Sequence, residues 1–444
     1  MSETNPPPVL PRRVHVKSFG CQMNVYDGAR MTELMVSQGM EDVVNMGDAD
    51  LVILNTCHIR EKATEKVYSD VGRLKRDDGS RPMIAIAGCV AQAQGKEIAR
   101  RAKVDIVVGP QSYHRLPELV QSASGGTLAI DIDMPLLSKF GALPDRRSVG
   151  PSAFLTVQEG CDKFCTYCVV PYTRGAEVSR PFAAILDEAK ALIDAGAKEI
   201  TLLGQNVNAW AGEDAAGRAV GLEAIIRALD KLGGLARIRY TTSHPNDMSD
   251  ALIAAHGDVE KLMPFLHLPV QAGSDRILRA MNRSHTRSSY LILLDKIRKV
   301  RHDIALSGDF IVGFPGESDA DFADTLSLVD AVGYAQAYSF KYSPRPGTPA
   351  ADMADQVPPE TMDERLQTLQ ASLFRDQAKF NAGTVGRRCP ILLERTGKKP
   401  GQLLGKSPWL QSVHIVCGAA IGDIVTVDMV ESGPLSMTGQ IIAS

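Results

Sequence analysis

Short apolar runs along the chain are separated by longer stretches in which apolar and polar residues recur with helical spacing. From residue 13 onward the apolar runs read VHVKSF, DLVILN, PMIAIA and VDIVVG. This alternation predicts β-strands joined by helices, and therefore a parallel sheet with right-handed crossovers. We predict an open doubly wound α/β domain over residues 13–125, preceded by a Pro-rich tail over residues 1–12.

A second series begins after residues 126–149, which are rich in turn formers and predict an inter-domain linker. Apolar runs separated by amphipathic stretches then predict six βα units over residues 150–382. Six units form an incomplete version of the eightfold barrel, in which the functional site lies at the carboxyl ends of the strands. The candidate strands are 153–158, 199–204, 236–242, 264–269, 305–313 and 335–342.

The pattern changes again after a helix-like stretch at residues 359–381. Short β-like runs, RCPILLER, LQSVHIV, DIVTVDMV and SMTGQIIA, are separated by turn-forming residues. Such closely spaced short strands predict a small closed β-barrel over residues 383–444. The expected fold class is thus α/β: a doubly wound domain, a partial (β/α)6 barrel and a small β-barrel.

Composition narrows the class of protein. The 444 residues are 44% apolar and 23% charged with a formal net charge of -3, which is typical of a globular chain of about three domains. The chain shows neither a signal peptide nor an apolar run of membrane-spanning length, so we expect a cytoplasmic protein without a membrane partner, and a monomer. In a reducing cytosol, clustered members of the eight cysteines favour metal ligation or thiol catalysis over disulfides.

Three cysteines fall within nine residues of the sequence GCDKFCTYC, directly after the first strand of the second series. Cys161, Cys165 and Cys168 could bind three irons of a cubane cluster and leave its fourth iron open for a small molecule. A structural zinc site is an alternative, although zinc usually takes four protein ligands. Three incidental buried cysteines are another.

Three further cysteines, Cys21, Cys57 and Cys89, each follow an apolar strand and precede a helix. Because parallel strands end at one edge of a sheet, the three thiols can converge there, and helix N-termini favour their thiolate forms. We interpret them as ligands of a second cluster, with ordinary core cysteines as the alternative. Cys389 and Cys417 lie in β-like runs without metal-ligand spacing and are interpreted as core or surface thiols.

The loop of Cys161, Cys165 and Cys168, with Tyr167 before the last cysteine, resembles the signature of radical S-adenosylmethionine (SAM) enzymes. The resemblance implies a [4Fe–4S] cluster that binds SAM and cleaves it to a 5′-deoxyadenosyl radical. The segments LLGQNVN, TTSHP and DFIVGFPGE resemble strand ends that cradle the cofactor in this family, although their Gly and Ser residues could simply turn the chain. The implied cofactor contacts are Tyr167, Gln205, Asn206, Ser243 and Gly313.

The segments SFGCQMN, NTCHIREKA, GCVAQ and YSPRPGTPA resemble the methylthiotransferase family over residues 13–440. This resemblance implies that Cys21, Cys57 and Cys89 hold an auxiliary [4Fe–4S] cluster with one free iron. The segments are most similar to the branch that methylthiolates C2 of N6-dimethylallyladenosine at position 37 of tRNA. One SAM would donate the methyl group and a second would supply the radical. His58 departs from the family pattern, which has a smaller residue such as Ser.

Other functions stay open at this level. Within the family, the substrate could be a ribosomal-protein aspartate or a threonylcarbamoyladenosine tRNA. Outside it, the chain could be an iron–sulfur RNA-binding redox sensor without turnover, or a zinc-stabilised RNA-binding scaffold. The favoured interpretation requires the anticodon stem-loop of a prenylated tRNA as partner, together with a reductase or other electron donor and a sulfur donor.

Local charge bears on RNA binding. Between Arg387 and Lys406 there are six Lys or Arg residues against one acid, in a segment that resembles the small TRAM-like RNA-binding barrel of tRNA-modifying enzymes. Such a barrel can hold the RNA backbone, whereas solvated charge is the ordinary explanation of such runs. Trp409 could stack on a base or fill the barrel core. A second basic stretch contains Arg276, Arg279, Arg283, Arg287, Lys296, Arg298, Lys299 and Arg301.

Overall fold

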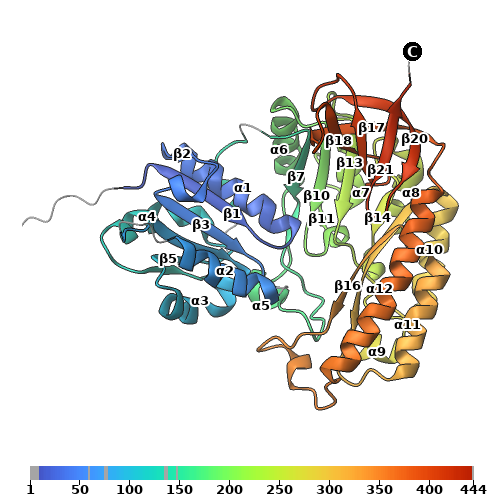
Figure 1. Cartoon of the computed structure of the whole chain (residues 1–444), viewed down its shortest axis with the longest axis horizontal. Helices are drawn as coiled ribbons and strands as arrows, with labels where there is room; N and C mark the ends of the chain where they lie inside the picture. Colours follow the sequence, from blue (N-terminus) through green and yellow to red (C-terminus); the bar gives the residue numbers. More distant parts are fainter. Residues whose placement is uncertain (1–9, 59–60, 75–78, 135–138, 147–148, 443–444) are drawn as a thin grey trace, which may run out of the picture. The chain divides into compact units, whose positions relative to one another are not determined.

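The computed structural model describes residues 10–58, 61–74, 79–134, 139–146 and 149–442, which divide into two compact units (Figure 1). The N-terminal unit comprises Met1–Arg146 together with Val169–Ala176, and the C-terminal unit comprises Arg147–Cys168 together with Glu177–Ser444. Val169–Ala176, which directly follow Cys168, therefore pack within the N-terminal unit. The predicted 1–12 tail falls mostly outside the described residues.

The N-terminal unit is built on a six-stranded parallel sheet in the order β2-β1-β3-β4-β5-β6. Apolar side chains of α1 and α4 pack on one face, and those of α2 and α3 pack on the other. This arrangement confirms the predicted doubly wound α/β fold. The elements are β1 (Arg13–Ser18), α1 (Gln22–Ser37), β2 (Glu41–Asp42), β3 (Leu51–Thr56), α2 (Glu61–Arg73), β4 (Met83–Gly88), α3 (Cys89–Ala102), β5 (Ile106–Val108), α4 (Leu116–Ser124), β6 (Ala129–Asp131) and α5 (Val170–Arg174).

The structure differs from the sequence prediction within residues 126–149, which we expected to be a linker. Ala129–Asp131 form β6, which pairs in parallel with β5 at the edge of the sheet. Backbone hydrogen bonds to β5 are enough to hold a strand of this length. The strand is too short to produce an apolar pattern in the sequence, and the prediction missed it for that reason. Residues 135–138 and 147–148 of the predicted linker lie outside the described residues.

The C-terminal unit begins with the predicted six parallel strands and their helices, which we call the partial barrel. The strands form two three-stranded sheets, β13-β10-β7 and β14-β15-β16, in place of one continuous sheet. The elements are β7 (Ser152–Thr156), β8 (Gln158–Glu159), β9 (Val178–Ser179), α6 (Phe182–Asp194), β10 (Glu199–Leu203), β11 (Ala211–Glu213), β12 (Ala219–Gly221), α7 (Leu222–Asp230), β13 (Arg237–Thr241), α8 (Asp250–Asp258), β14 (Phe265–His267), α9 (Asp275–Ala280), α10 (Arg287–Val300), β15 (Ala305–Val312), α11 (Asp319–Val332), β16 (Gln336–Lys341) and α12 (Pro359–Ala382).

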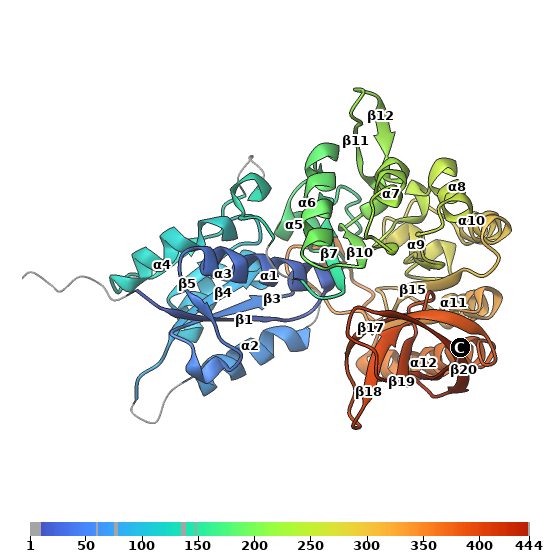
Figure 2. The same cartoon turned by 90° about the horizontal axis from the view of Figure 1, so that it is seen from above.

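Alternate residues of the barrel strands point to opposite faces, and the outer face carries the core. In β13, Ile238 and Tyr240 belong to the main apolar cluster with side chains of α6, α7, α8, α10 and α11, whereas Arg237 and Arg239 occupy the alternate positions. Figure 2 shows the β11–β12 hairpin extending away from α7. Within the described ranges no helix is both long and apolar enough to cross a membrane.

The last five strands close into the predicted small barrel, which we call the C-terminal barrel, in the order β17-β18-β19-β21-β20. The sequence pattern missed β18, because only two of its five residues are apolar. Gly405 in β18 lies so close to β17 that a Cβ there would be 2.4 Å from the Leu392 carbonyl oxygen. The strands are β17 (Arg388–Thr396), β18 (Gln402–Lys406), β19 (Ser412–Val416), β20 (Ile424–Ser432) and β21 (Met437–Ile441).

Burial of His256 couples the stability of the partial barrel to pH. The side chain is buried, its Nε2 lies 2.6 Å from Tyr240 Oη, and burial lowers its pKa to about 4. The unfolded chain has an ordinary histidine pKa near 6.5, so between these values only the unfolded state takes up the proton. Stability is therefore full above pH 6.5. We expect the free energy of unfolding to fall below it, by up to about 1.4 kcal/mol per pH unit from this group.

Chemical denaturation of the apoprotein between pH 7.5 and pH 4 measures this effect. His256→Gln should reduce the slope of stability against pH in that window. His302→Gln is the matched control, since His302 is exposed and should leave the slope unchanged. Equal slopes for the H256Q variant and the wild type would contradict the assignment.

Candidate functional site

The three clustered cysteines lie on one loop, residues 160–168, which we call the cysteine loop. It follows β7 and β8 at the carboxyl side of the first barrel strand. Cys161, Cys165 and Cys168 are not in disulfide bonds, and the Cys168 N–H donates to the Cys165 carbonyl at 2.9 Å. Burial raises the pKa of the Cys161 thiol to about 11. A cation bound at the loop would favour the thiolates that this burial opposes.

The segment after α9 holds the cysteine loop in shape. Asn282 Nδ2 donates to the Phe164 carbonyl at 2.9 Å, and the Thr166 hydroxyl donates to the Ala280 carbonyl at 2.9 Å. Phe164 and Asn282 both adopt left-handed backbone conformations, with φ of 47° and 57°. Such strain persists only where surrounding contacts impose it, and it gathers at functional sites. The loop is therefore preorganised by residues more than a hundred positions away.

Arg283 is a site residue that sequence reasoning listed only as part of a basic stretch. Its guanidinium is buried, with Nη1 3.7 Å from the Cys165 sulfur and Nη2 donating to the Pro269 carbonyl at 2.6 Å. Among the residues that the structure describes, its Nε has no hydrogen-bond partner. The positive charge lies beside the thiol and would stabilise a thiolate there. No local signal marks Arg283, since 118 positions separate it from Cys165.

The predicted cofactor residues Gln205, Asn206 and Ser243 come together at the carboxyl ends of β10 and β13. Gln205 Oε1 accepts from the Gly160 N–H at 2.6 Å, which ties β10 to the start of the cysteine loop. Asn206 Nδ2 donates to Asp247 at 2.8 Å. Buried polar atoms of all three, namely Gln205 Nε2, Asn206 Oδ1 and Ser243 Oγ, have no partner within the described protein. A polar ligand fits such a set, because buried polar atoms are nearly always hydrogen-bonded.

Gly313 and Tyr167, also predicted to contact the cofactor, occupy tight positions. Gly313 has φ +71°, its N–H donates to Glu317 at 2.9 Å, and a Cβ there would lie 2.2 Å from Met362 Cγ. Only glycine fits this turn at the end of β15. The Tyr167 ring packs against an apolar cluster that includes Phe314 and Tyr342, and burial raises its pKa. Its contact with the cofactor stays a prediction.

Two neutral histidines complete this end of the partial barrel. The rings of His244 and His285 have centroids 5.8 Å apart. Burial lowers the pKa of His244 to about 2 and that of His285 to about 4, so both are uncharged at neutral pH. A hydrogen bond with the Val270 backbone opposes the shift at His285, and the ring nitrogens make no other hydrogen bond among the described residues.

The N-terminal trio, Cys21, Cys57 and Cys89, does converge at the carboxyl edge of the six-stranded sheet. Cys21 precedes α1 and Cys89 is the first residue of α3. A Cβ on Gly20 would lie 2.9 Å from the Cys57 sulfur, and Cys21 and Cys57 share a hydrogen bond. Gly20 and Gly88 each precede a cysteine of the trio with a positive φ, which lets the strand turn sharply into the helix.

The surroundings of the N-terminal trio are electrostatically organised. The hydrogen bond with Cys57, aided by Arg174, lowers the pKa of Cys21 to about 6, whereas burial raises the pKa of Cys89. Arg174 in α5 is buried, pairs with Asp27 at 2.6 Å and also reaches Cys89. A buried cation beside three thiols suits an anionic metal–thiolate centre. Sequence reasoning missed Arg174, which follows the other cysteine set in the chain.

The remaining cysteines and His58 lie apart from a metal-ligand arrangement in the described structure. Within the described ranges, no three His, Cys, Asp or Glu side chains are grouped closely enough to hold a single metal ion. Cys389 lies in the core of the C-terminal barrel, and Cys417 packs against that core. Both match their interpretation as ordinary thiols. His58 is buried beside Cys57.

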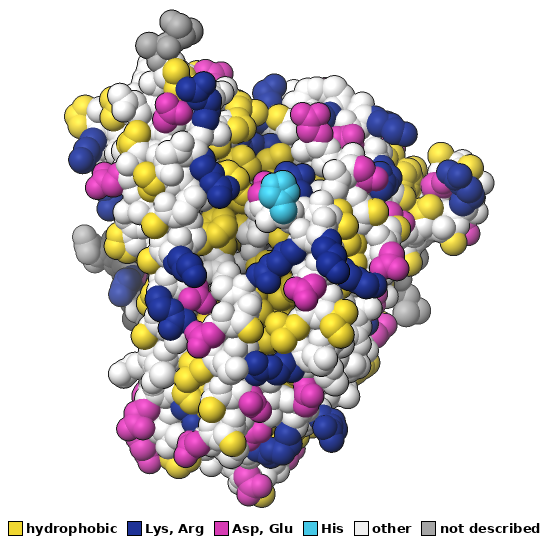
Figure 3. Space-filling view, turned by 90° about the vertical axis from the view of Figure 1, so that its right-hand side faces the viewer, with side chains coloured by type: hydrophobic (Ala, Val, Ile, Leu, Met, Phe, Trp, Pro, Cys, Tyr) yellow, Lys and Arg dark blue, Asp and Glu magenta, His cyan; other side chains and the backbone are white. Residues whose placement is uncertain are grey.

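The two basic stretches differ in how their charges are paired and exposed. In the stretch 276–301, three of the eight cations are in ion pairs: Arg276 with Asp321, Lys296 with Asp250 and Arg301 with Asp303. On the face that Figure 3 presents, basic and acidic side chains are interspersed. In and directly before the C-terminal barrel, Arg387, Arg388, Arg395, Lys398 and Lys399 are exposed, and of these Arg388 pairs with Asp428 at 3.2 Å. The C-terminal barrel therefore remains the better candidate for RNA contact.

Comparison with known proteins identifies the class. A model of the radical SAM superfamily matches residues 155–329, and one of the uncharacterized protein family UPF0004 matches residues 13–109. The radical SAM methyltransferase TsrM from Kitasatospora setae aligns over 77% of both chains with a TM-score of 0.56 at 13% identity. The cobalamin-dependent radical enzyme OxsB aligns over 82% of this chain and 56% of its own, with a TM-score of 0.51 at 12% identity. These likenesses show the fold, which is that of a radical SAM protein.

Curated relatives extend over the full length. The tRNA-2-methylthio-N(6)-dimethylallyladenosine synthase of Novosphingobium aromaticivorans is 68% identical over 99% of this chain and 100% of its own. That of Agrobacterium fabrum is 56% identical over 98% of both chains. The chain belongs to the tRNA-2-methylthio-N(6)-dimethylallyladenosine synthase family, which confirms the branch predicted from its cysteine-bearing segments. Membership of the radical SAM superfamily implies SAM and a [4Fe–4S] cluster as cofactors.

Gly20→Ala tests the packing of the N-terminal trio. A Cβ at Gly20 would meet Cys57 Cβ at 2.2 Å and would also sit on a backbone with φ +102°. We expect Cys57 to be displaced, stability to fall by about 2 kcal/mol or more, and iron binding by the trio to weaken. Gly39→Ala is the matched control, because Gly39 has φ +89° with nothing within 4 Å. Equal iron content in the G20A and G39A variants after reconstitution would contradict this expectation.

Proposed function

We propose that the chain methylthiolates C2 of N6-dimethylallyladenosine at position 37 of tRNA. The observation that carries the proposal is a full-length match to synthases of that name combined with two separate sets of three thiols, each at the carboxyl edge of a parallel sheet. Three thiols leave one iron of each cubane without a protein ligand, as a reaction at the metal requires. An enzyme of this kind replaces a C–H bond with a C–S bond at an unactivated carbon.

The cofactors supply the hard chemistry. When bound, they would supply a methyl group from one SAM and, by one-electron cleavage of a second SAM, a radical able to abstract the hydrogen atom from C2. The protein holds and orients these groups. Cys161, Cys165 and Cys168 would ligate one cluster, with Arg283 offsetting thiolate charge. Gln205, Asn206 and Ser243 would satisfy polar groups of SAM with the atoms that lack partners, and Gly313 would leave room for its approach.

The N-terminal trio would ligate the auxiliary [4Fe–4S] cluster, which is the finer part of the cofactor prediction. Support comes from the shared position of Cys21, Cys57 and Cys89 at strand ends and from the buried Arg174 beside them. The chain passes directly from Cys168 through Val169–Ala176 into the unit that carries this trio. One covalent segment thus connects both sets of ligands.

The partners follow from the chemistry. A prenylated tRNA is the substrate, and its anticodon stem-loop would contact exposed cations of the C-terminal barrel such as Lys398 and Lys399. A reductase or equivalent donor supplies the electron for SAM cleavage, and a sulfide source supplies the sulfur. We propose a monomer in the cytoplasm, with an N-terminal domain that extends beyond residue 125 to include β6, followed by the partial barrel and the C-terminal barrel.

Product analysis tests the function. Anaerobically reconstituted enzyme with SAM, a low-potential reductant, sulfide and prenylated tRNA should yield 2-methylthio-N6-dimethylallyladenosine, detected by mass spectrometry of nuclease digests. The same tRNA without the prenyl group is the matched control and should yield much less product. Unmodified C2 in the prenylated substrate would refute the assignment. A methylthio group on threonylcarbamoyladenosine or on a ribosomal-protein aspartate would move the enzyme to another branch.

Replacing each cysteine set separately tests the two-cluster arrangement. Cys21/Cys57/Cys89→Ala should retain about four irons and four sulfides per chain and still form 5′-deoxyadenosine, but without methylthiolated product. Cys161/Cys165/Cys168→Ala should also retain about four irons but form no 5′-deoxyadenosine. Cys389→Ala/Cys417→Ala is the control and should keep both clusters. Full iron content in either triple variant would show that its cysteines are not the ligands.

A further inference from the structure

The C-terminal barrel contacts the partial barrel at the end opposite the cysteine loop. The contacting residues include the first residues of four strands: Ser152 of β7, Arg237 of β13, Phe265 of β14 and Ala305 of β15. The cysteine loop follows the carboxyl end of the first strand of the same barrel. The two ends of the parallel strands therefore carry different elements of the C-terminal unit.

Two buried arginines of β13 make most of the polar contacts. Arg237 donates through Nη1 to the Lys406 carbonyl at 2.8 Å and through Nη2 to the Pro390 carbonyl at 2.7 Å. Arg239 donates through Nη1 and Nη2 to the carbonyls of Pro408 and Ser407, each at 2.9 Å. These four carbonyls all belong to the C-terminal barrel. We call this arrangement the arginine clamp.

The charge of the arginine clamp is compensated by one buried acid. Arg239 Nε donates to Glu199 Oε2 at 2.9 Å, and Arg237 Nη1 lies 3.9 Å from the same oxygen. All three side chains are at most 3% exposed. Burial lowers the pKa of Arg237 to about 10, which leaves it protonated at neutral pH. Removing one member would leave the other charges and carbonyls buried without partners, which makes the clamp hard to open.

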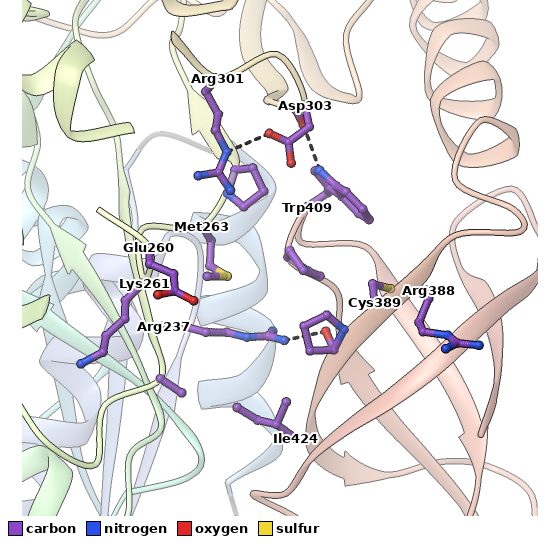
Figure 4. Close-up of a pocket in the computed structure, with 14 residues that line it drawn as sticks. Arg237, Glu260, Lys261, Met263, Arg301, Asp303, Arg388, Cys389, Trp409 and Ile424 are labelled. Carbon is purple, nitrogen blue, oxygen red and sulfur yellow. Dashed lines mark hydrogen bonds and ion pairs between the residues drawn. The ribbon is translucent and has the colours of Figure 1, made fainter. Parts of the chain in front are cut away.

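Apolar and polar contacts around the arginine clamp support the same docking. Trp409 Nε1 donates to the Asp303 carbonyl at 2.9 Å, and its ring packs with Phe265 and Ala305. The Trp409 ring therefore lies between the barrels, and it neither stacks freely in solvent nor fills the C-terminal barrel core alone. Figure 4 shows Arg237 and Trp409 bridging the two parts beside a cleft of about 520 Å³. At the far edge, the Ser152 hydroxyl donates to Glu394 at 2.7 Å.

The cations of the arginine clamp differ in burial from those exposed on the C-terminal barrel. Arg237 and Arg239 are buried, and their guanidinium groups donate to carbonyls of the C-terminal barrel and to Glu199. Arg395, Lys398 and Lys399 are exposed on the C-terminal barrel. Only five residues, 383–387, connect α12 to β17. The arginine clamp therefore fixes the position of the exposed cations relative to the partial barrel.

We propose that Arg237 and Arg239 are positioning residues that hold the C-terminal barrel, and the tRNA bound to it, in fixed register with the cysteine loop. The inference rests on the proposed function, because it assigns a purpose to the RNA-binding barrel of that enzyme. A fixed barrel presents the target adenosine in one place, so that each radical formed meets its substrate. A barrel free to move would still bind RNA electrostatically but would present the base poorly.

The experiment compares reconstituted wild-type enzyme with the Arg237→Gln/Arg239→Gln variant. We expect the KM for prenylated tRNA to rise at least ~10-fold, because an undocked barrel holds its cations in the tRNA-binding arrangement only part of the time, and the apparent affinity falls by that fraction. The yield of methylthiolated product per 5′-deoxyadenosine should fall. The KM for SAM and the rate of tRNA-independent SAM cleavage should stay unchanged, since the cysteine loop lies at the other end of the strands. A general loss of folding would instead reduce SAM cleavage and methylthiolated product together.

Arg227→Gln is the matched control, because Arg227 pairs with Asp258 in the same unit at 3.0 Å but is exposed. It should leave every value unchanged. If the double variant loses iron or fails to fold, two single variants are used in its place. Arg239→Lys keeps the positive charge but removes guanidinium donors, and Trp409→Phe keeps an aromatic ring but removes the indole N–H. A raised tRNA KM with normal SAM cleavage in these variants supports the proposal. An unchanged tRNA KM and an unchanged product yield overturn it, whereas absence of product from the wild type defeats only the proposed function.

Discussion

Parallel strands end at a common edge, and the chemistry of this chain depends on that constraint. In the six-stranded sheet, more than thirty residues separate each of Cys21, Cys57 and Cys89 from the next. Their thiols nevertheless converge, because each cysteine follows a strand that ends at the same edge. In the partial barrel the cysteine loop, Gln205, Asn206 and Ser243 lie at strand ends for the same reason. Left-handed turns at Gly20, Gly88 and Gly313 allow the chain to change direction there without a clashing side chain.

The amino ends of the partial-barrel strands attach the C-terminal barrel. Alternation along β13 sends Ile238 and Tyr240 into the helical core and leaves Arg237 and Arg239 for the carbonyls of the C-terminal barrel. One short strand therefore contributes to the core, to docking and, through Ser243 just beyond it, to the candidate cofactor site. A parallel barrel makes this division natural, because its two ends are separated by the length of the strands.

Burial determines what each charged group can do. Three of the eight cations in the basic stretch 276–301 are in ion pairs, whereas Arg283 within it is buried against Cys165. The cations of the C-terminal barrel remain exposed. Charge counted along the sequence does not separate these cases, because a guanidinium beside a thiol, one in a surface ion pair and one free in solvent look alike in composition.

The sequence by itself determined the fold class, the six cysteines of interest and the family, because hydrophobic periodicity, loop spacing and motif composition are local properties of the chain. It predicted four of the six strands of the N-terminal sheet and missed β2 and β6, which are very short. In the C-terminal barrel it missed β18, which has few apolar residues. Tertiary structure alone decided which atoms are left without partners, that Arg283 and Arg174 lie beside the thiols, and that Arg237 and Arg239 join the two barrels. Those contacts connect residues far apart in the chain, and no local pattern encodes them.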